Sequence, residues 1–358
     1  GGAISTKKVV PMAKQRGSRL LYADRLRVAA SLAVVAVHIC GAWIDQAPVG
    51  SAAWNTLNVY DSLVHWCVPV FVMLSGMFLL DPERKVTGRD LLRHGLRIAV
   101  ALAAWSAIYA LAGVLLDGKP LGAWWGEMRN VVWGKLHYHL WFLPMLLGLY
   151  LLTPVLRAFV RGAAQGEMRW FFLLVFGAAM VLPTLLAIRP SKTVSTWMNQ
   201  LDLRMVLGYG SYYILGYCLK TCRLSRRKEG LIYLLGLAGA VWTAAGTAWL
   251  SAEMGPRFTF YGYFSPNVAC MASAVFLLFR RLPEGANAGR WTGPLAGITF
   301  GIYLCHDLFL MLLRHWGVST LSFAPVLSVP VLTLGVFGCA ALTAWLLSRL
   351  PVLGRYLT

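Results

Sequence analysis

Runs of about 20 mainly apolar residues recur along the chain, and this feature limits the possible folds more than any other. A helix of that length crosses the hydrocarbon layer of a bilayer and satisfies its own backbone hydrogen bonds there. The runs are continuous and lack the alternation of apolar and polar residues that is typical of a membrane β-barrel. The sequence therefore predicts an all-α integral membrane protein, folded as a single bundle of transmembrane helices.

Composition favours the same class of fold. Hydrophobic residues make up 58% of the 358 residues and charged residues only 13%, which leaves too little polar surface to solvate a soluble fold. We interpret residues 1–18 as a cytoplasmic tail or tag remnant and residues 19–358 as one transmembrane domain. About ten spans are expected. They lie near residues 26–44, 62–80, 91–116, 139–160, 170–188, 205–221, 230–250, 266–281, 295–315 and 326–349.

The distribution of lysine and arginine predicts the orientation of these helices, because both residues accumulate in short cytoplasmic loops. If the N-terminus is cytoplasmic, 25 of the 33 lysines and arginines lie on the cytoplasmic side and 8 on the other. Acidic residues divide about evenly between the sides, so the asymmetry is specific to positive charge. Both termini are therefore predicted to be cytoplasmic.

The formal net charge of +19 does not indicate a nucleic-acid partner. The basic residues are dispersed at the predicted membrane boundaries, where they favour anionic lipid headgroups, and they form no single stripe. None of the seven cysteines belongs to a Cys-x-x-Cys pair, so we expect the cysteines to act as small, buried apolar residues. The histidines lie on separate predicted helices without ligand spacing, and no metal site is predicted.

Ionisable residues inside predicted spans are the first candidates for function, because burying them in lipid is costly. The first predicted helix carries Asp24, Arg27 and His38. At a rise of about 1.5 Å per residue, His38 lies roughly 16 Å deeper than Arg27 and on nearly the same face. The alternative is a structural role for His38 in a hydrogen bond between helices.

A second place is the pair His306-Asp307 within the predicted helix 295–315, at a depth similar to that of His38. A third is the predicted outer edge of the bundle. Histidines there could exchange protons and bind a sugar hydroxyl, with tryptophan stacking on the ring. An interfacial aromatic belt explains Trp141, Trp124, Trp125 and Trp133 equally well. The residues at this edge are Asp61, His65, His137, Tyr138, His139 and Trp141.

The fourth place is a basic cluster at the start of the predicted helix 91–116, formed by Arg89, Arg93, His94 and Arg97. Three guanidinium groups within three turns could hold the phosphates of a nucleotide-like donor. The alternative is that they anchor the helix at the cytoplasmic surface.

These elements together resemble acyltransferase family 3, the membrane O-acyltransferases that modify bacterial surface glycans, and in particular its polysaccharide O-acetyltransferase branch. Asp24, Arg27 and His38 match the family's first-helix signature, Arg-x10-His with Asp three residues before the Arg. The similarity covers nearly all of 20–358. It continues through Phe71-Val72-Met73-Leu74-Ser75-Gly76, Trp105-Ser106-Ala107-Ile108-Tyr109, His139-Leu140-Trp141-Phe142-Leu143, Leu151-Leu152-Thr153-Pro154, Tyr213-Ile214-Leu215-Gly216-Tyr217 and Phe300-Gly301-Ile302-Tyr303-Leu304-Cys305-His306.

Two positions depart from the family pattern. The family usually carries Arg-x-x-Arg where this chain has His94 three residues before Arg97, with Arg93 displaced by one residue. The family's later His is commonly followed by Pro or a small residue, whereas Asp307 follows His306 here.

The resemblance implies an acetyl-CoA donor that enters from the cytoplasm and a glycan or lipid-linked saccharide acceptor on the other side of a bacterial cytoplasmic membrane. His38 is then the general base of a direct transfer, while an acyl-histidine intermediate is the alternative chemistry. Arg27 positions His38 or the donor, with Asp24 as its partner. Arg93, His94 and Arg97 are the expected donor-binding residues. Candidates for binding the acceptor or supporting His38 are His306, Asp307, His65, His139, Trp141 and Ser75.

Other function classes share this composition. Buried His, Asp and Arg could also serve a proton-coupled transporter or glycan exporter, although the repeated halves common among transporters are not visible in the sequence. Within the enzymes, transfer of succinyl or another acyl group is the closest alternative. A purely structural scaffold would not need His38 and His306 inside the membrane.

Overall fold

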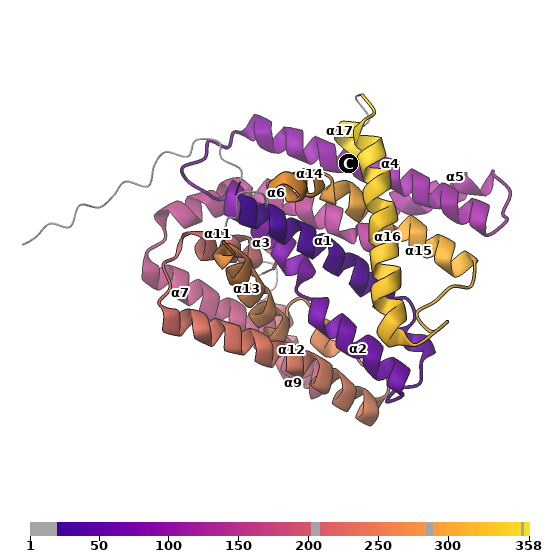
Figure 1. The fold of residues 1–358 in the computed structure, drawn as a ribbon. Helices are drawn as coiled ribbons and strands as arrows, with labels where there is room; N and C mark the ends of the chain where they lie inside the picture. The colour runs from indigo at the N-terminus through magenta and orange to yellow at the C-terminus, as the bar shows by residue number, and fades with distance from the viewer. Residues whose placement is uncertain (1–19, 202–207, 284–288, 352–353) are drawn as a thin grey trace, which may run out of the picture.

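The structure, a computed structural model, describes residues 20–201, 208–283, 289–351 and 354–358. All regular secondary structure in these ranges is helical, which confirms the predicted all-α class (Figure 1). The predicted tail at 1–18 and the first residues of the predicted helix 205–221 lie outside the described residues.

Long helices are joined by turns, some of which contain short helical segments. In chain order they are α1 (Leu21–Gly41), η1 (Ile44–Gln46), α2 (Ala52–Val64), α3 (Cys67–Leu79), α4 (Gly88–Leu116), α5 (Ala123–Val132), η2 (Tyr138–Trp141), α6 (Phe142–Gly162), α7 (Gln165–Leu174), η3 (Val175–Val181), α8 (Leu182–Ile188), α9 (Lys192–Leu201), α11 (Gly210–Thr221), α12 (Arg226–Met254), η4 (Thr259–Tyr261), α13 (Pro266–Arg281), α14 (Gly289–Gly297), α15 (Thr299–His315), α16 (Pro325–Ser348) and α17 (Gly354–Leu357).

Eight helical segments in the described part of the chain are long and apolar enough to cross a membrane, and the pair α14 and α15, bent by 65°, adds a ninth if it counts as one span. The helix α11 has only 12 residues, too few to cross alone. The protein is thus a multi-pass membrane protein, and the prediction of ten spans is not confirmed. The eight segments are Leu21–Gln46, Ala52–Leu79, Gly88–Leu116, Tyr138–Gly162, Gln165–Ile188, Arg226–Met254, Thr259–Arg281 and Pro325–Ser348.

The turns between these segments gather at two ends of the bundle. We call one the basic end, which contains the start of α1 and the turns 80–87 and 222–225. Side chains join its elements, since the ammonium of Lys220 lies 2.6 Å from the carboxylate of Asp81. We call the other the far end, which contains the turns 42–51, 255–265 and 316–324. That the basic end faces the cytoplasm remains a prediction.

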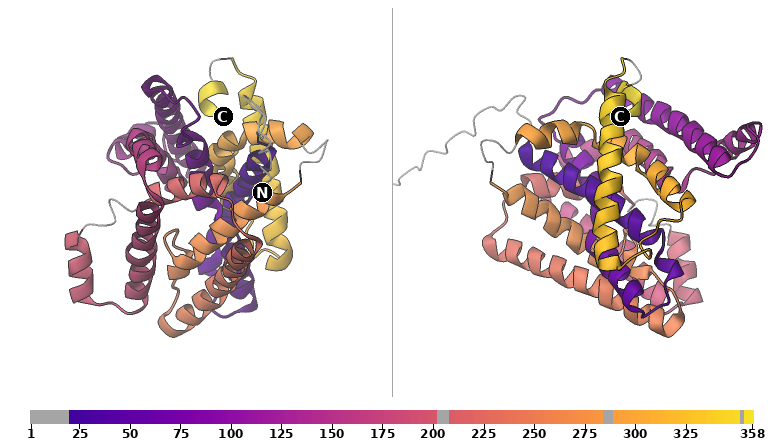
Figure 2. Two further views of the ribbon diagram at one scale, coloured as in Figure 1. Left: turned by 90° about the vertical axis from the view of Figure 1, so that its left-hand side faces the viewer. Right: turned by 45° about the vertical axis from the view of Figure 1, so that its right-hand side comes forward.

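The first helix lies in the interior of the bundle. It packs against α2, α3, α13, α14, α15 and α16, and α16 crosses it in Figures 1 and 2. Leu26 and Ala30 on α1 are consequently inaccessible, whereas Leu334 on α16 keeps 61% of its surface exposed. An apolar side chain exposed on a helix of this hydropathy is solvated by lipid. Asp24 of α1 is therefore held inside the protein, and His38 faces the cavities within the bundle.

Two glycines, one on α3 and one on α11, allow these two helices to lie side by side. A Cβ atom on Gly76 of α3 would lie 1.9 Å from the carbonyl oxygen of Tyr213 on α11, and one on Gly216 of α11 would lie 2.0 Å from that of Met73. Each glycine thus allows the backbone of the other helix to approach closely, as small residues do at membrane helix crossings. This crossing packs the short helix α11 against α3.

The second span differs from the prediction. It begins at Ala52, ten residues before the predicted start at 62, and it is broken between α2 and α3 near His65. Polar residues such as Asn58 and Asp61 gave this stretch the composition of a loop, but both side chains are 2% exposed and point into the bundle. Asp61 and His65 therefore lie within the span, and their predicted place at its outer edge was wrong.

Candidate active site

Three adjoining cavities run through the bundle from the basic end toward the far end. The inner cavity, of about 370 Å³, opens among Asp24, Arg27, Phe78, Arg84 and His94. A central cavity of about 240 Å³ continues from it, because both are lined by Arg27, Leu74, Ser75, His94 and Tyr150.

His38 separates the central cavity from an outer cavity of about 620 Å³, and its side chain lines both. The other polar residues around the outer cavity are Asp45, Asp61, His65, Tyr138, Tyr261 and Arg314. A ligand entering from the basic end and a ligand entering from the far end would thus meet at His38.

The inner cavity contains the start of the Arg-x10-His signature. Nη1 of Arg27 donates a hydrogen bond of 3.2 Å to Oδ1 of Asp24, one helical turn earlier. Asp24 is 2% exposed, so its carboxylate is stabilised by contacts within the protein. The Arg27 guanidinium also lies 5.1 Å from the centre of the Phe78 ring. As predicted from the spacing, Arg27 and His38 face the same side of α1, because both line the central cavity.

Aromatic rings surround His38 on the side of α15 and η2. The ring of His306 stacks on it at 5.0 Å between centroids, and Tyr138 meets it edge-on at 5.2 Å. His139 lies at 6.3 Å. No hydrogen bond holds the His38 ring nitrogens within the described residues, so they can serve a ligand in either cavity.

Asp307 is the buried anion of this cluster. Its side chain is inaccessible, and it accepts hydrogen bonds from Nε2 of His137 and from the hydroxyl of Tyr138. The ring of Tyr109 stacks on His137 at 4.3 Å and holds that imidazole in place. Since Tyr138 contacts both Asp307 and His38, a fixed negative charge lies one side chain away from His38.

Several nitrogens in the cluster lack a partner. Nδ1 of His306 lies 2.7 Å from the carbonyl oxygen of Tyr303 and donates to it, which leaves Nε2 unprotonated in the neutral ring. That Nε2 and both ring nitrogens of His139 are buried without a hydrogen-bond partner among the described residues. Buried polar atoms of this kind are costly and are typical of a site completed by a ligand or water.

One group of side chains in the described part of the chain could also hold a metal ion. A nitrogen from each of His137 and His139 and an oxygen of Asp307 lie within 4.8 Å of one another. Imidazole and carboxylate are ligands for Zn²⁺, although Asp307 and His137 already bond to each other. The sequence did not reveal this group, because its members come from two distant segments.

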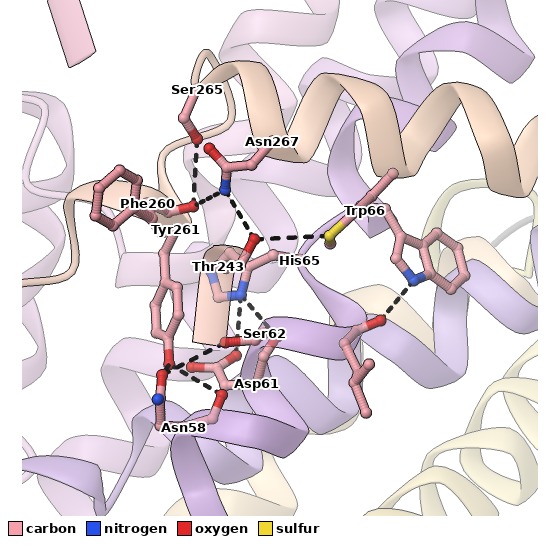
Figure 3. Close-up of polar contacts among 12 residues, drawn as sticks. Asn58, Asp61, Ser62, His65, Trp66, Thr243, Phe260, Tyr261, Ser265 and Asn267 are labelled. Carbon is pink, nitrogen blue, oxygen red and sulfur yellow. Dashed lines mark hydrogen bonds and ion pairs between the residues drawn. The ribbon is translucent and has the colours of Figure 1, made fainter. Parts of the chain in front are cut away.

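The wall of the outer cavity carries a carboxylate and imidazole pair, shown in Figure 3. Nδ1 of His65 lies 3.0 Å from the backbone oxygen of Asp61 and 3.1 Å from its Oδ1. The His65 ring stacks on Tyr261 at 4.3 Å, and the Tyr261 hydroxyl donates to Oδ1 of Asn58 at 2.6 Å. The imidazole is therefore oriented by its neighbours, with its Nδ1 hydrogen directed at Asp61.

Trp141 belongs to the wall of the central cavity. Its ring stacks on Tyr263 at 5.9 Å, and both residues line the cavity. Trp125 and Trp133, in contrast, are 71% and 78% exposed and suit the predicted interfacial belt. The tryptophans thus divide between the two interpretations that the sequence allowed.

The predicted donor-binding residues also divide. His94 and Arg97 line the central cavity, whereas Arg93 is exposed on α4 and lines none of the three cavities. Arg97 donates to the carbonyl oxygen of Thr358, and its guanidinium lies 5.3 Å from the centre of the Phe300 ring. The structure therefore brings two of the three predicted residues to the cavity.

Ser75 lies between the inner and central cavities and lines both. Its hydroxyl donates 3.1 Å to the carbonyl oxygen of Phe71 in the preceding turn of α3. The oxygen keeps lone pairs that could accept from a ligand.

Sequence reasoning missed Arg157 of α6, which is 6% exposed. Its guanidinium donates to the carbonyl oxygens of Leu79 at 2.5 Å, Asp81 at 3.0 Å and Arg84 at 2.7 Å. The residue counted only as one more positive charge at the basic end, because its partners lie more than 70 positions away in the sequence.

The family model of the acyltransferase domain matches residues 20–347. The chain belongs to acyltransferase family 3. No curated protein and no solved structure matches the chain. The match covers α1 to α16 almost entirely, so all three cavities of this acyltransferase lie within the matched region. The protein is thus a multi-pass membrane acyltransferase.

Proposed function

We propose that this acyltransferase moves an acetyl group from cytoplasmic acetyl-CoA to a hydroxyl of a cell-surface or lipid-linked glycan. The observation that carries the proposal is the place of His38, which lines the central and the outer cavity at once. A donor and an acceptor that approach from opposite ends of the bundle can both reach its imidazole. The bacterial cytoplasmic membrane is the proposed location, with the basic end inside.

The donor enters through the basic end in this scheme. The inner and central cavities are lined by Arg27, His94 and Arg97, which suit the phosphates of a coenzyme A thioester. The helix from Arg27 to His38 is roughly 16 Å long, a distance that an extended pantetheine arm can follow. The thioester then lies in the central cavity beside His38.

The acceptor occupies the outer cavity. Its hydroxyl oxygen attacks the thioester carbonyl carbon while His38 takes the hydroxyl proton. The tetrahedral intermediate collapses, the carbon–sulfur bond breaks, and the imidazolium of His38 returns the proton to the departing thiolate. His139, whose ring nitrogens are unpartnered in the described structure, is a candidate donor to the oxyanion. No metal ion is required for this sequence of steps.

Asp307 supports the charged intermediate of this reaction. When His38 becomes an imidazolium, the buried carboxylate behind Tyr138 and His306 supplies the opposite charge. Asp61 and His65 face the acceptor from the outer cavity, where His65 Nε2 can accept from a sugar hydroxyl.

The experiment that tests the proposal uses membrane vesicles containing the protein, acetyl-CoA labelled in the acetyl group, and lipid-linked oligosaccharides of defined structure. We expect the label to appear in the glycan. Mild alkali should then release the labelled acetyl group, because it is bound as an ester. Labelled succinyl-CoA in a parallel reaction tests the alternative acyl group. Translocation of the oligosaccharide without ester formation would instead support the transporter interpretation and contradict this proposal.

A further inference from the structure

The mouth of the inner cavity contains a cation that the transfer chemistry does not use. We propose that Arg84, together with Phe78, forms a subsite for the 3′-phosphorylated nucleotide end of acetyl-CoA. This inference rests on the proposed function, because it concerns the recognition of the same donor. It assigns a binding role to the turn between α3 and α4.

The turn that carries Arg84 is held in place from two sides. The buried guanidinium of Arg157 bonds the carbonyl oxygens of Leu79, Asp81 and Arg84, so the backbone of the turn cannot easily move. From α11, the ammonium of Lys220 lies 2.6 Å from the carboxylate of Asp81. A side chain on this turn is therefore presented to the cavity by a pre-organised backbone, which reduces the entropic cost of binding a ligand.

The charges at the mouth leave Arg84 available. Two acids at the mouth are already engaged, since Asp24 accepts from Arg27 and Asp81 pairs with Lys220. No ion pair of Arg84 occurs in the described part of the chain, although its side chain lines the inner cavity. An exposed guanidinium fixed at a cavity mouth can bind a phosphate through two parallel hydrogen bonds.

Phe78 supplies an apolar surface beside this charge. Three cations lie around its ring, with Arg27 at 5.1 Å, Lys220 at 5.8 Å and Arg84 at 5.9 Å from the centroid. Positive charge and an aromatic face within a few ångströms match a ligand that joins phosphate to a nucleobase, because bases stack on aromatic rings. Acetyl-CoA has this combination in its 3′-phosphoadenosine end.

The position along the passage agrees with the length of the donor. Arg84 and Phe78 line the inner cavity at the basic end, whereas His38 lines the central cavity where it adjoins the outer one. If the nucleotide binds at the mouth, the pantetheine arm runs past Ser75 and Tyr150, which line both cavities, to bring the thioester to His38. The nucleotide end thus fixes the depth at which the thioester stops.

The test is a calorimetric titration of the detergent-purified protein with acetyl-CoA and with acetyl-3′-dephospho-CoA, which lacks only the 3′-phosphate. We expect the wild-type protein to bind the dephosphorylated donor at least about tenfold more weakly, as the loss of a charge-assisted contact predicts. Arg84→Gln should bind both donors with nearly the same, weaker affinity. Arg84→Lys should recover only part of the difference, because it retains the charge and loses the fork.

Arg226→Gln is the matched control, since Arg226 is an exposed arginine at the same end that lines none of the three cavities. It should distinguish the two donors as the wild type does. Equal wild-type affinity for the two donors, or full discrimination in Arg84→Gln, would overturn the subsite while leaving the proposed function standing. A wild-type protein that binds neither donor would overturn both.

Discussion

The inner and outer cavities, which are connected through the central cavity beside His38, differ in how they carry charge. The inner cavity exposes permanent cations, Arg27 and Arg84, near the basic end. The outer cavity instead combines one guanidinium, that of Arg314, with the carboxylates of Asp45 and Asp61 and the imidazole of His65, which pairs with Asp61. Under the proposed function, the two cavities suit different ligands, a polyanion in the inner one and a hydroxyl group in the outer one.

Membrane depth explains the contrast. An arginine within about one turn of the membrane surface can keep its guanidinium hydrated, so its charge costs little. A group near the bilayer centre is far from water, and a neutral imidazole or a hydrogen-bonded pair is cheaper there than an isolated ion.

Removing the His38 imidazole, which lies between the central and outer cavities, should have the largest effect. His38→Ala is expected to lower the rate of acetyl transfer by at least about a hundredfold, because it removes the proton acceptor from the reacting hydroxyl. Donor affinity, measured by calorimetry, should change little, since the phosphate-binding groups remain. Near-normal turnover in this variant would exclude His38 from the chemistry.

Arg27→Lys tests whether the inner cavity needs a guanidinium or only a charge. The Arg27 side chain bonds Asp24 and faces the cavity, and lysine would lose the second parallel hydrogen bond. A loss of about 1–3 kcal/mol, or roughly ten- to a hundredfold in rate, is expected with normal expression. Wild-type kinetics would show that Arg27 serves only as a membrane anchor.

Arg97 and Arg93 offer a comparison within one helix. Arg97→Ala should weaken acetyl-CoA binding several-fold to about tenfold, because Arg97 lines the central cavity. Arg93→Ala should change it little, since Arg93 is exposed outside the cavities. Calorimetry in detergent measures both. Equal effects of the two substitutions would contradict the division that the structure makes between them.

A substitution in the outer cavity should change the KM for the acceptor and leave the KM for the donor unchanged. His65→Gln is expected to raise the KM for the lipid-linked oligosaccharide several-fold, as the loss of one or two hydrogen bonds predicts. The KM for acetyl-CoA should stay unchanged. His315→Gln, at an exposed histidine of the same end, provides the control. An increase confined to the donor KM would contradict the proposed place of His65 at the acceptor site.

Orientation can be checked without an activity measurement. In a protein without its native cysteines, Gln46→Cys at the far end and Ser225→Cys at the basic end should differ in labelling by a membrane-impermeant maleimide. We expect label on Gln46→Cys in intact cells and on Ser225→Cys only after lysis, because the positive charges favour a cytoplasmic basic end. The reverse pattern would require the donor to enter from outside.

Much of the architecture could be predicted from local sequence. Long apolar runs require helices in lipid, and the described residues of every predicted span are mostly helical, with breaks such as those at 65–66 and 298, because hydropathy acts on each segment separately. The clearest error lies in a segment that other segments bury. The second span was predicted to begin at residue 62 but begins at Ala52, and polar side chains within it, such as Asn58 and Asp61, are buried.

The sequence by itself determined that the protein is an all-α membrane protein and that Arg27 and His38 share one face of α1, because both follow from the length and periodicity of single helices. Only the tertiary structure decided which groups surround His38. Asp307 of α15 meets His137 and Tyr138 at the start of η2, and Arg157 reaches the turn of Arg84 from α6. Contacts between distant segments depend on how side chains fill the space between helices, which no single segment encodes.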